Sequence, residues 1–175
     1  MKKQDTLKPI DLVVAISLAL RNHATGTYSE LAEVLGVSAS TAFEAVQRLQ
    51  RAGLIRPGSR EPNVRALRNF LAHGAKPAFP PALGREVQGV PTAHAAPALR
   101  HLFDSDKPVV WPSAKGSARG TSLTPLYPRA VELPTHSPSL YNALALVDAL
   151  RVGQARERNA AMSALDDALG VSGRG

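Results

Sequence analysis

The sequence predicts a mainly α-helical protein, in which a short N-terminal helical region is followed by a proline-rich segment with a small β-hairpin and by C-terminal helices. Apolar residues recur at helical spacing in residues 9–21, 27–54, 63–74 and 139–169. Five prolines interrupt residues 77–99, which excludes a long helix there. Pro108–Trp111 and Thr121–Leu123 are the best strand candidates, and residues 113–117 suit a hairpin loop between them.

Two helices separated by a tight turn are predicted after Thr27. Thr27 and Glu30 have the spacing of a capping box, in which each side chain satisfies a backbone N–H that the helix leaves without a partner. The apolar face of this first helix is formed by Leu31, Val34 and Leu35. Gly36 ends it, because a residue without Cβ adopts the left-handed conformation cheaply. Val37 is expected to fill the corner, and Ser38 caps the next helix.

The second helix has two distinct faces. Ala42, Val46 and Leu49 recur at helical spacing and are expected to face inward. The opposite face is formed by Ser40, Glu44, Gln47 and Arg51. Gly53 closes the helix, and residues 54–56 predict a short strand that runs into a turn at Pro57 and Gly58. A strand at this position would begin a wing.

These residues resemble the MarR-like winged helix-turn-helix transcriptional regulators. The pattern E-L-A-x-x-L-G-V-S-x-S-T is matched from Glu30 to Thr41, and R-L-x-x-A-G-L-I is matched from Arg48 to Ile55. The resemblance implies that the helix beginning near Ser38 enters the major groove of DNA, and that the segment after Ile55 touches the DNA backbone or minor groove. The chain departs from the family pattern at Phe43 and Glu44, where a basic residue is usual, and in its short wing.

The resemblance gives each candidate DNA-binding residue a role. These candidates are Ser38, Ser40, Thr41, Phe43, Glu44, Gln47, Arg48, Arg51, Arg56 and Arg60. The hydroxyls near the helix start would contact phosphate or a base edge, Gln47 would pair with adenine, and Glu44 would accept from a cytosine amino group. Phe43 would press on a thymine methyl or, alternatively, fill space beside the wing. The four arginines are expected at phosphates, with Arg60 also able to enter the minor groove.

Composition favours a polyanionic partner. The net charge is +7, and residues 1–76 hold 11 Lys and Arg against 6 Asp and Glu, whereas residues 77–175 hold 10 against 8. Phosphate neutralisation releases counterions and supplies affinity for any DNA sequence. The chain has no cysteine, so a disulfide framework is excluded and a cytoplasmic location is expected. The apolar run from Leu12 to Leu20 is too short for a membrane span.

We predict three regions: a winged helix-turn-helix DNA-binding domain (1–76), a proline-rich segment with a short β-hairpin (77–138) and C-terminal helices (139–170). The proline-rich segment is rich in alanine, so it is expected to lie against its own domain or against a second subunit. The C-terminal helices can form a dimer interface or an intramolecular helical hairpin. Trp111, the sole tryptophan, is expected to anchor the small β unit.

No motif for catalysis, phosphate binding or a cofactor occurs in the sequence, so neither an enzyme nor a cofactor is expected. His94 and His101 lie seven residues apart, but Pro97 between them makes a continuous helix doubtful, and no metal site is expected. The favoured function is a double-stranded DNA-binding regulator, a repressor acting as a homodimer. The alternative is an antitoxin-like or assembly protein whose C-terminal half binds a protein partner.

Overall fold

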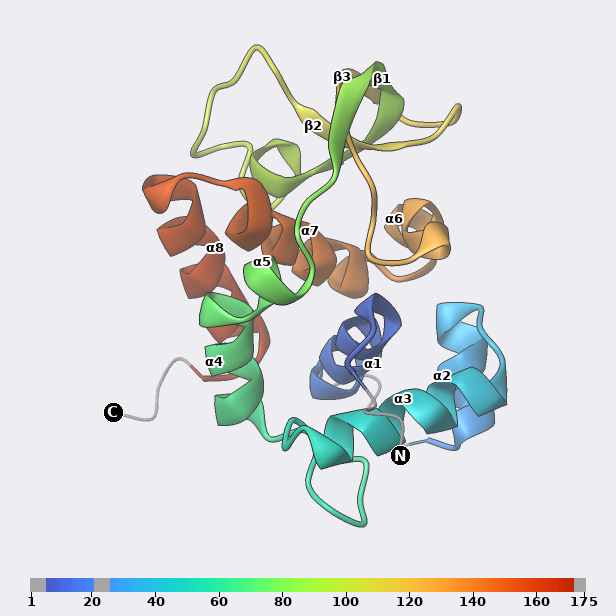
Figure 1. The fold of residues 1–175 in the computed structure, drawn as a ribbon. Helices are drawn as coiled ribbons and strands as arrows, with labels where there is room; N and C mark the ends of the chain where they lie inside the picture. Colours follow the sequence, from blue (N-terminus) through green and yellow to red (C-terminus); the bar gives the residue numbers. More distant parts are fainter. Residues whose placement is uncertain (1–5, 21–25, 172–175) are drawn as a thin grey trace.

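The protein is described by a computed structural model that covers residues 6–20 and 26–171 (Figure 1). As predicted, it is mainly helical with a small sheet. In chain order the elements are α1 (Pro9–Ala19), α2 (Tyr28–Leu35), α3 (Ala39–Arg51), α4 (Val64–His73), α5 (Ala75–Ala78), β1 (Leu83–Thr92), η1 (Ala93–Ala95), β2 (Val109–Pro112), β3 (Ala118–Leu123), η2 (Pro128–Glu132), α6 (Leu133–His136), α7 (Pro138–Val152) and α8 (Ala155–Ala168).

Two helices, α1 and α7, form the centre of the molecule. Residues 11–18 of α1 are all buried, as are nearly all residues between Leu140 and Arg151 of α7. Figure 1 shows α1 between α3 and α7, and it packs against both of them. One hydrophobic cluster extends from α1 to α8. The three regions predicted from the sequence therefore share a continuous core.

The three strands form a small closed barrel in which β1 pairs with both of the others. β2 lies antiparallel to the second half of β1, with Val90 opposite Trp111, and β3 lies antiparallel to the first half, with Val87 opposite Gly120. The prediction of a hairpin between β2 and β3 is therefore wrong. These two strands run in the same direction and pair in parallel at Val109 and Thr121. Residues 113–117 carry the chain from one half of β1 to the other.

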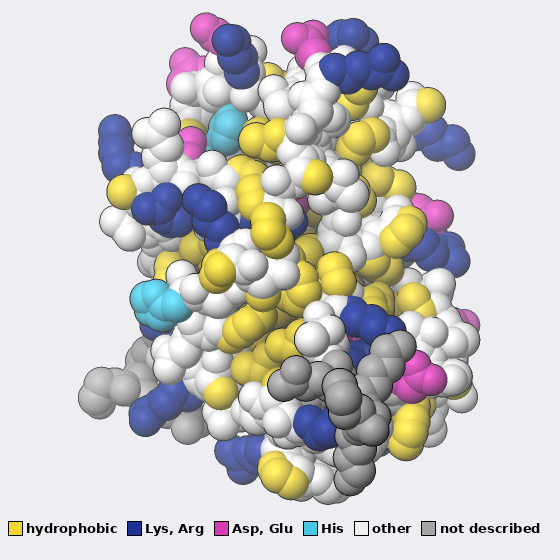
Figure 2. All heavy atoms as spheres, in the orientation of Figure 1, with side chains coloured by type: hydrophobic (Ala, Val, Ile, Leu, Met, Phe, Trp, Pro, Cys, Tyr) yellow, Lys and Arg dark blue, Asp and Glu magenta, His cyan; other side chains and the backbone are white. Residues whose placement is uncertain are grey.

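The proline-rich segment lies against its own chain. It contributes β1, which the sequence did not predict because two glycines and a proline interrupt its apolar pattern. Further along, α7 and α8 pack on one another, so the intramolecular helical hairpin is the arrangement found within this chain. On the face shown in Figure 2, hydrophobic side chains gather across the middle of the molecule. Leu7 and Pro9, which precede and begin α1, line a pocket together with Phe79, Pro80 and Leu126.

A buried carboxylate holds the second half of the protein together. Asp148 of α7 is 1% exposed, and its Oδ2 accepts hydrogen bonds from Thr92 Oγ1 and Trp111 Nε1, both at 2.7 Å. Its Oδ1 accepts from Arg151 Nη1 at 2.8 Å, and Arg151 Nε donates to the carbonyl of Phe79 at 2.8 Å. Burial raises the pKa of Asp148, while Arg151 and the other donors oppose that rise. One carboxylate thus joins β1, β2 and α7, and its arginine fixes the chain leading into β1.

Replacing this carboxylate is expected to destabilise the fold severely. Asp148→Ala leaves a buried guanidinium and two buried donors without their acceptor, which should lower the free energy of unfolding in urea by about 3–5 kcal/mol. Asp148→Asn keeps the shape and one acceptor oxygen and should lose less. Asp167→Ala, on the exposed side of α8, is the matched control. Equal stability of Asp148→Ala and this control would contradict the assigned role.

Candidate nucleic-acid interface

The helix-turn-helix begins with the cap predicted from the sequence. The backbone N–H of Thr27 donates to Glu30 Oε2 at 2.7 Å, and the N–H of Glu30 donates to Thr27 Oγ1 at 3.2 Å. Gly36 ends α2 in the left-handed conformation with φ of 65°, and Val37 is partly buried in the corner. Val34 differs from the prediction, because its side chain is 39% exposed. The short turn places α3 across the end of α2.

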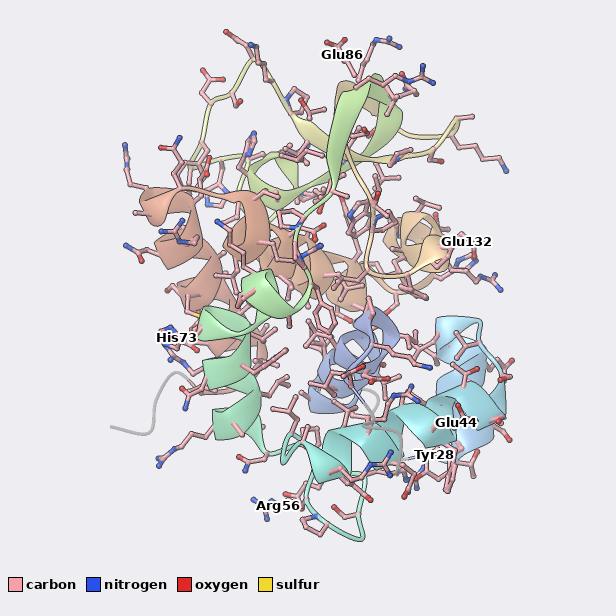
Figure 3. All side chains as sticks on the ribbon, in the orientation of Figure 1. Tyr28, Glu44, Arg56, His73, Glu86 and Glu132 are labelled. Atoms are coloured by element: carbon pink, nitrogen blue, oxygen red, sulfur yellow. The ribbon has the colours of Figure 1, made fainter. Side chains whose placement is uncertain are left out.

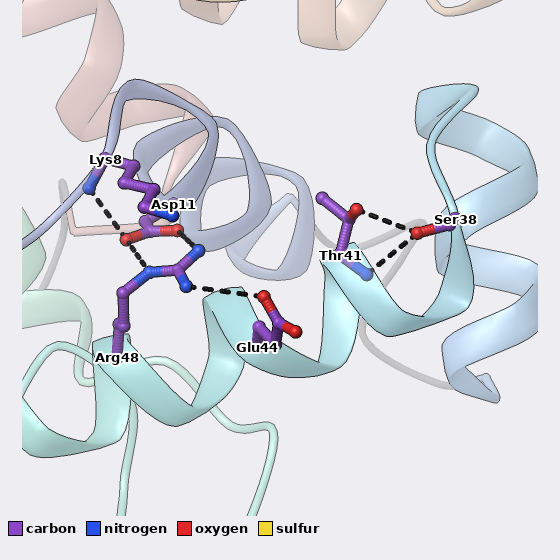
Figure 4. Close-up of polar contacts among 6 residues, drawn as sticks. All are labelled: Lys8, Asp11, Ser38, Thr41, Glu44 and Arg48. Atoms are coloured by element: carbon purple, nitrogen blue, oxygen red, sulfur yellow. Dashed lines mark hydrogen bonds and ion pairs between the residues drawn. The ribbon is translucent and has the colours of Figure 1, made fainter. Parts of the chain in front are cut away.

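At the start of α3 the hydroxyls serve the helix itself (Figure 4). Ser38 Oγ accepts from the backbone N–H of Thr41 at 3.0 Å and lies 2.8 Å from Thr41 Oγ1. Ser38 is exposed and Thr41 is half-buried. Both predicted DNA-binding residues therefore take part in the helix cap. Ser40, which lies between them in the sequence, is also exposed.

The two faces of α3 separate as predicted. Ala42, Val46 and Leu49 are completely buried. The outer face carries Ser40, Phe43, Glu44, Gln47 and Arg51, all exposed except Gln47, which is half-buried. Polar, aromatic, acidic and basic groups thus lie together along one face of the helix, which offers both donors and acceptors of hydrogen bonds.

Arg48 requires a correction. It was predicted to contact a phosphate, but it is 8% exposed and faces α1. Its Nε donates to Asp11 Oδ2 at 2.8 Å and its Nη2 donates to Asp11 Oδ1 at 2.7 Å, which is a bidentate pair (Figure 4). The same Asp11 Oδ2 accepts from the backbone N–H of Lys8 at 2.8 Å. Arg48 therefore locks α3 onto α1, and it is not available to DNA.

An aromatic pair that the sequence analysis missed extends the outer face. The exposed ring of Phe43 meets Tyr28 of α2 edge-on, with 5.3 Å between centroids, and the guanidinium carbon of Arg60 lies 5.1 Å from the centre of the Tyr28 ring. Phe43 thus packs against Tyr28, which in turn contacts the wing loop through Arg60. It is 48% exposed, which leaves its ring open to a ligand. Figure 3 shows Tyr28 and Glu44 close together on this side.

The wing is shorter than predicted. In place of a strand, residues 54–56 contribute a single bridge between Ile55 and Pro62. Gln50 Nε2 donates to the carbonyl of Ser59 at 2.6 Å, so the loop is tied to α3. Arg56 at its base is ion-paired with Glu61 at 3.6 Å, and both side chains are more than 60% exposed. Figure 3 shows Arg56 projecting from the loop.

Acidic groups moderate the charge of this surface. Glu44 lies 3.9 Å from Arg48 Nη1 at the edge of the buried pair and is itself 61% exposed. On the next helix, α4, Arg65 is exposed, whereas Arg68 pairs with Asp166 of α8 at 2.6 Å. Among the described residues of α3, the wing and α4, Arg51, Arg56 and Arg65 are exposed cations, and Arg60 is half-buried beside Tyr28.

Residues 14–56 match the family model described as winged helix-turn-helix DNA-binding. The match covers about a quarter of the 175-residue chain and includes α2, α3 and the strand-like entry to the wing. It confirms the winged helix-turn-helix prediction for this part of the chain. Comparison with curated proteins and with solved structures found no match.

Neither a candidate metal cluster nor a membrane-spanning helix occurs in the part of the chain that the structure describes. There, no three His, Asp or Glu side chains lie close enough together to hold a metal ion. Within residues 6–20 and 26–171, no helix is both long and apolar enough to cross a membrane.

The buried pair gives a direct test of how α3 is held. Arg48→Met leaves Asp11 charged and buried, and should lower the free energy of unfolding by about 3–5 kcal/mol in urea denaturation. The double variant Asp11→Leu, Arg48→Met removes both charges and should recover most of that loss. The decisive result is whether the double variant is more stable than Arg48→Met alone. If Arg48 only contacted DNA, the second substitution would not restore the free energy of unfolding.

Proposed function

We propose that this protein is a sequence-specific, double-stranded DNA-binding transcriptional regulator of the MarR-like kind, a non-enzymatic repressor acting in the cytoplasm as a homodimer. The observation that carries the proposal is the outer face of α3, solvent-exposed and polar, within a segment that matches winged helix-turn-helix DNA-binding proteins. The positive net charge adds affinity for any phosphate backbone.

Base reading would fall to the middle of α3. Gln47 presents an amide that can pair with adenine, and Ser40 can reach a base edge or a phosphate. Glu44 can accept from a cytosine amino group, since its carboxylate is still largely exposed. Phe43 would contact a thymine methyl, while its ring packs edge-on against Tyr28.

Phosphate contacts would come from both ends of this surface. Arg51 is exposed near the C-terminal end of α3, and Arg56 is exposed at the base of the wing. The pair between Arg56 and Glu61 lies in solvent, so its exchange for a phosphate costs little. Arg60 would use the side of its guanidinium that does not stack on Tyr28.

The homodimer is proposed because the area that one winged domain can bury on DNA is small. A single winged domain buries a small area on DNA, so specific affinity normally comes from two copies on a palindromic site. The buried residues of α7 pack inside the chain, so a dimer would have to form through other surfaces. The alternative function is an antitoxin-like or assembly protein that wraps a partner with its proline-rich segment. In the structure this segment contributes β1 to the chain's own barrel, so β1 is already paired within the chain. A mass of one subunit at micromolar concentration would exclude the dimer.

The first experiment compares binding to a labelled fragment of the protein's own promoter with binding to unrelated DNA of equal length, at two salt concentrations. A preference for the promoter that persists at the higher salt is expected for a sequence-specific regulator, because phosphate contacts weaken with salt and base contacts remain. Equal and salt-sensitive binding to both fragments would reject sequence-specific regulation.

Arg51→Ala should weaken binding to all DNA alike. Loss of one phosphate contact reduces the slope of log affinity against log salt by about one unit. Arg156→Ala, which removes an exposed cation from α8 on the other half of the protein, is the matched control and should leave the slope unchanged. Identical slopes for both variants and the wild type would remove Arg51 from the interface.

Gln47→Ala should instead change specificity. Losing a bidentate amide–adenine contact costs about 1–3 kcal/mol on the preferred site and little on unrelated DNA. Affinity for the promoter should therefore fall toward that for unrelated DNA, with the salt slope preserved. A uniform loss on both fragments would indicate that Gln47 does not read a base.

A further inference from the structure

Two neighbouring side chains on the outer face of α3 carry different chemistry. Phe43 is 48% exposed and the side chain of Glu44 is 61% exposed, so an apolar ring and a carboxylate both reach solvent there. These are also the two positions at which the chain departs from the family pattern, where a basic residue is usual. The family pattern therefore does not say what this pair recognises.

The ring of Phe43 is held in position from one side. It packs edge-on against Tyr28 of α2, and the guanidinium of Arg60 lies over the Tyr28 ring, 5.1 Å from its centre. This stack restricts the Phe43 ring and still leaves nearly half of the residue exposed. A fixed, exposed ring suits a methyl group of a base, because the contact removes apolar surface of both partners from water.

The carboxylate of Glu44 is positioned by the buried ion pair behind it. Asp11 accepts hydrogen bonds from Nε and Nη2 of Arg48, and the remaining nitrogen, Nη1, lies 3.9 Å from Glu44 Oε2 (Figure 4). Because Arg48 is locked onto α1, its charge attracts the carboxylate to one edge of the outer face. Among the described residues this carboxylate makes no other hydrogen bond or ion pair, so it can accept a hydrogen bond from a base.

The two side chains are placed to meet one base pair. Consecutive residues of an α-helix differ by about 1.5 Å along its axis and by about 100° around it. Base pairs are about 3.4 Å apart, so the two residues fall within one step of the duplex. Around the helix they flank the line of Ser40, Gln47 and Arg51, with Phe43 on the side of α2 and Glu44 on the side of α1. A base edge would be contacted from both sides.

The chemistry of this pair can be compared with each base edge in the major groove. A carboxylate accepts a hydrogen bond from the amino group of cytosine or adenine and repels the carbonyl oxygens of thymine and guanine. The ring favours a methyl group on C5, which thymine has and which unmodified cytosine and adenine lack. Glu44 and Phe43 thus favour different bases when each is considered alone. In 5-methylcytosine the amino group and the C5 methyl group lie side by side, and this base satisfies both residues.

We propose that Phe43 and Glu44 together read 5-methylcytosine in the major groove, so that the protein binds a site methylated at C5 of cytosine more tightly than the same site unmethylated. The proposal rests on the function proposed above and names the base that this part of α3 recognises. Occupancy of the site would then follow the methylation of the DNA as well as its sequence.

The test first locates the bound site by footprinting on the promoter fragment. Single cytosines of that site are then replaced by 5-methylcytosine, or by thymine paired with adenine, and affinity is measured by fluorescence anisotropy. At a cytosine read by this pair, 5-methylcytosine should raise the affinity about fourfold, the gain from burying one methyl group. Thymine at the same position should bind at least about tenfold more weakly than 5-methylcytosine, because its O4 faces the carboxylate.

Two variants separate the two roles. Phe43→Ala should remove the gain from methylation, whereas Leu83→Ala, which removes an exposed leucine from β1, should keep it. Glu44→Gln should bind thymine and 5-methylcytosine about equally, because an amide can donate to O4 as well as accept from an amino group. Asp167→Asn, on the exposed side of α8, is the matched control for this variant.

The outcomes distinguish this inference from the function on which it rests. A site bound with equal affinity whether its cytosines are methylated or not, a methylation gain that survives Phe43→Ala, or a Glu44→Gln variant that still rejects thymine would each overturn the reading of 5-methylcytosine. A protein that protects no part of the promoter fragment would refute the proposed regulator itself, and this inference with it.

Discussion

The second half of this fold depends on one buried acid in the middle of α7. A carboxylate removed from water is unfavourable unless its lone pairs are satisfied, and Asp148 meets that requirement with a tryptophan, a threonine and an arginine from three different elements. Thr92 and Trp111, which lie on β1 and β2, would be buried without their acceptor if α7 shifted. The network therefore specifies one arrangement of strands on helix, which nonspecific apolar packing alone would not do.

In the first half of the protein, a second buried carboxylate, that of Asp11, holds the candidate DNA-reading helix α3 in place. Asp11, in the first turn of α1, holds Arg48 from the buried side of α3, opposite the stripe that faces solvent. A helix held by a two-point ion pair cannot roll about its axis without breaking both bonds. The direction in which Gln47 and Phe43 point is consequently fixed before any ligand arrives, and little conformational freedom remains to be lost on binding.

Local features of the fold were predictable because their chemistry lies within a few residues. Three predicted features depend only on short-range spacing, and the structure contains all of them: the capping box of Thr27 and Glu30, the left-handed conformation of Gly36 and the N-cap at Ser38. The roles of the arginines were harder to predict from the sequence, because they depend on partners that are distant in the chain. Arg48 meets an aspartate 37 residues away and Arg68 one 98 residues away, and no local pattern distinguishes such arginines from those that face solvent. The contribution of Tyr28 was missed for the same reason.

The strands show a further limit of sequence patterns. β2 and β3 were located correctly, yet their pairing depends on β1, whose glycines and proline obscure a strand pattern. Gly89 and Gly120 are needed there because the chains approach too closely for a side chain: a Cβ on Gly89 would fall 2.2 Å from the Trp111 carbonyl oxygen. Composition predicted a proline-rich segment that lies against other parts of the protein, and the structure shows that part of this segment is a strand paired on both sides.

Closure of the barrel has a consequence for how the protein behaves in a crowded solution. A flat three-stranded sheet would have two open edges, and each would be a template for pairing with a strand of another molecule. Here β1 hydrogen-bonds on both sides, and β2 and β3 complete the ring. The second half therefore gains a sheet without edge strands that could recruit other chains, and this protects it against strand-mediated aggregation and domain swapping.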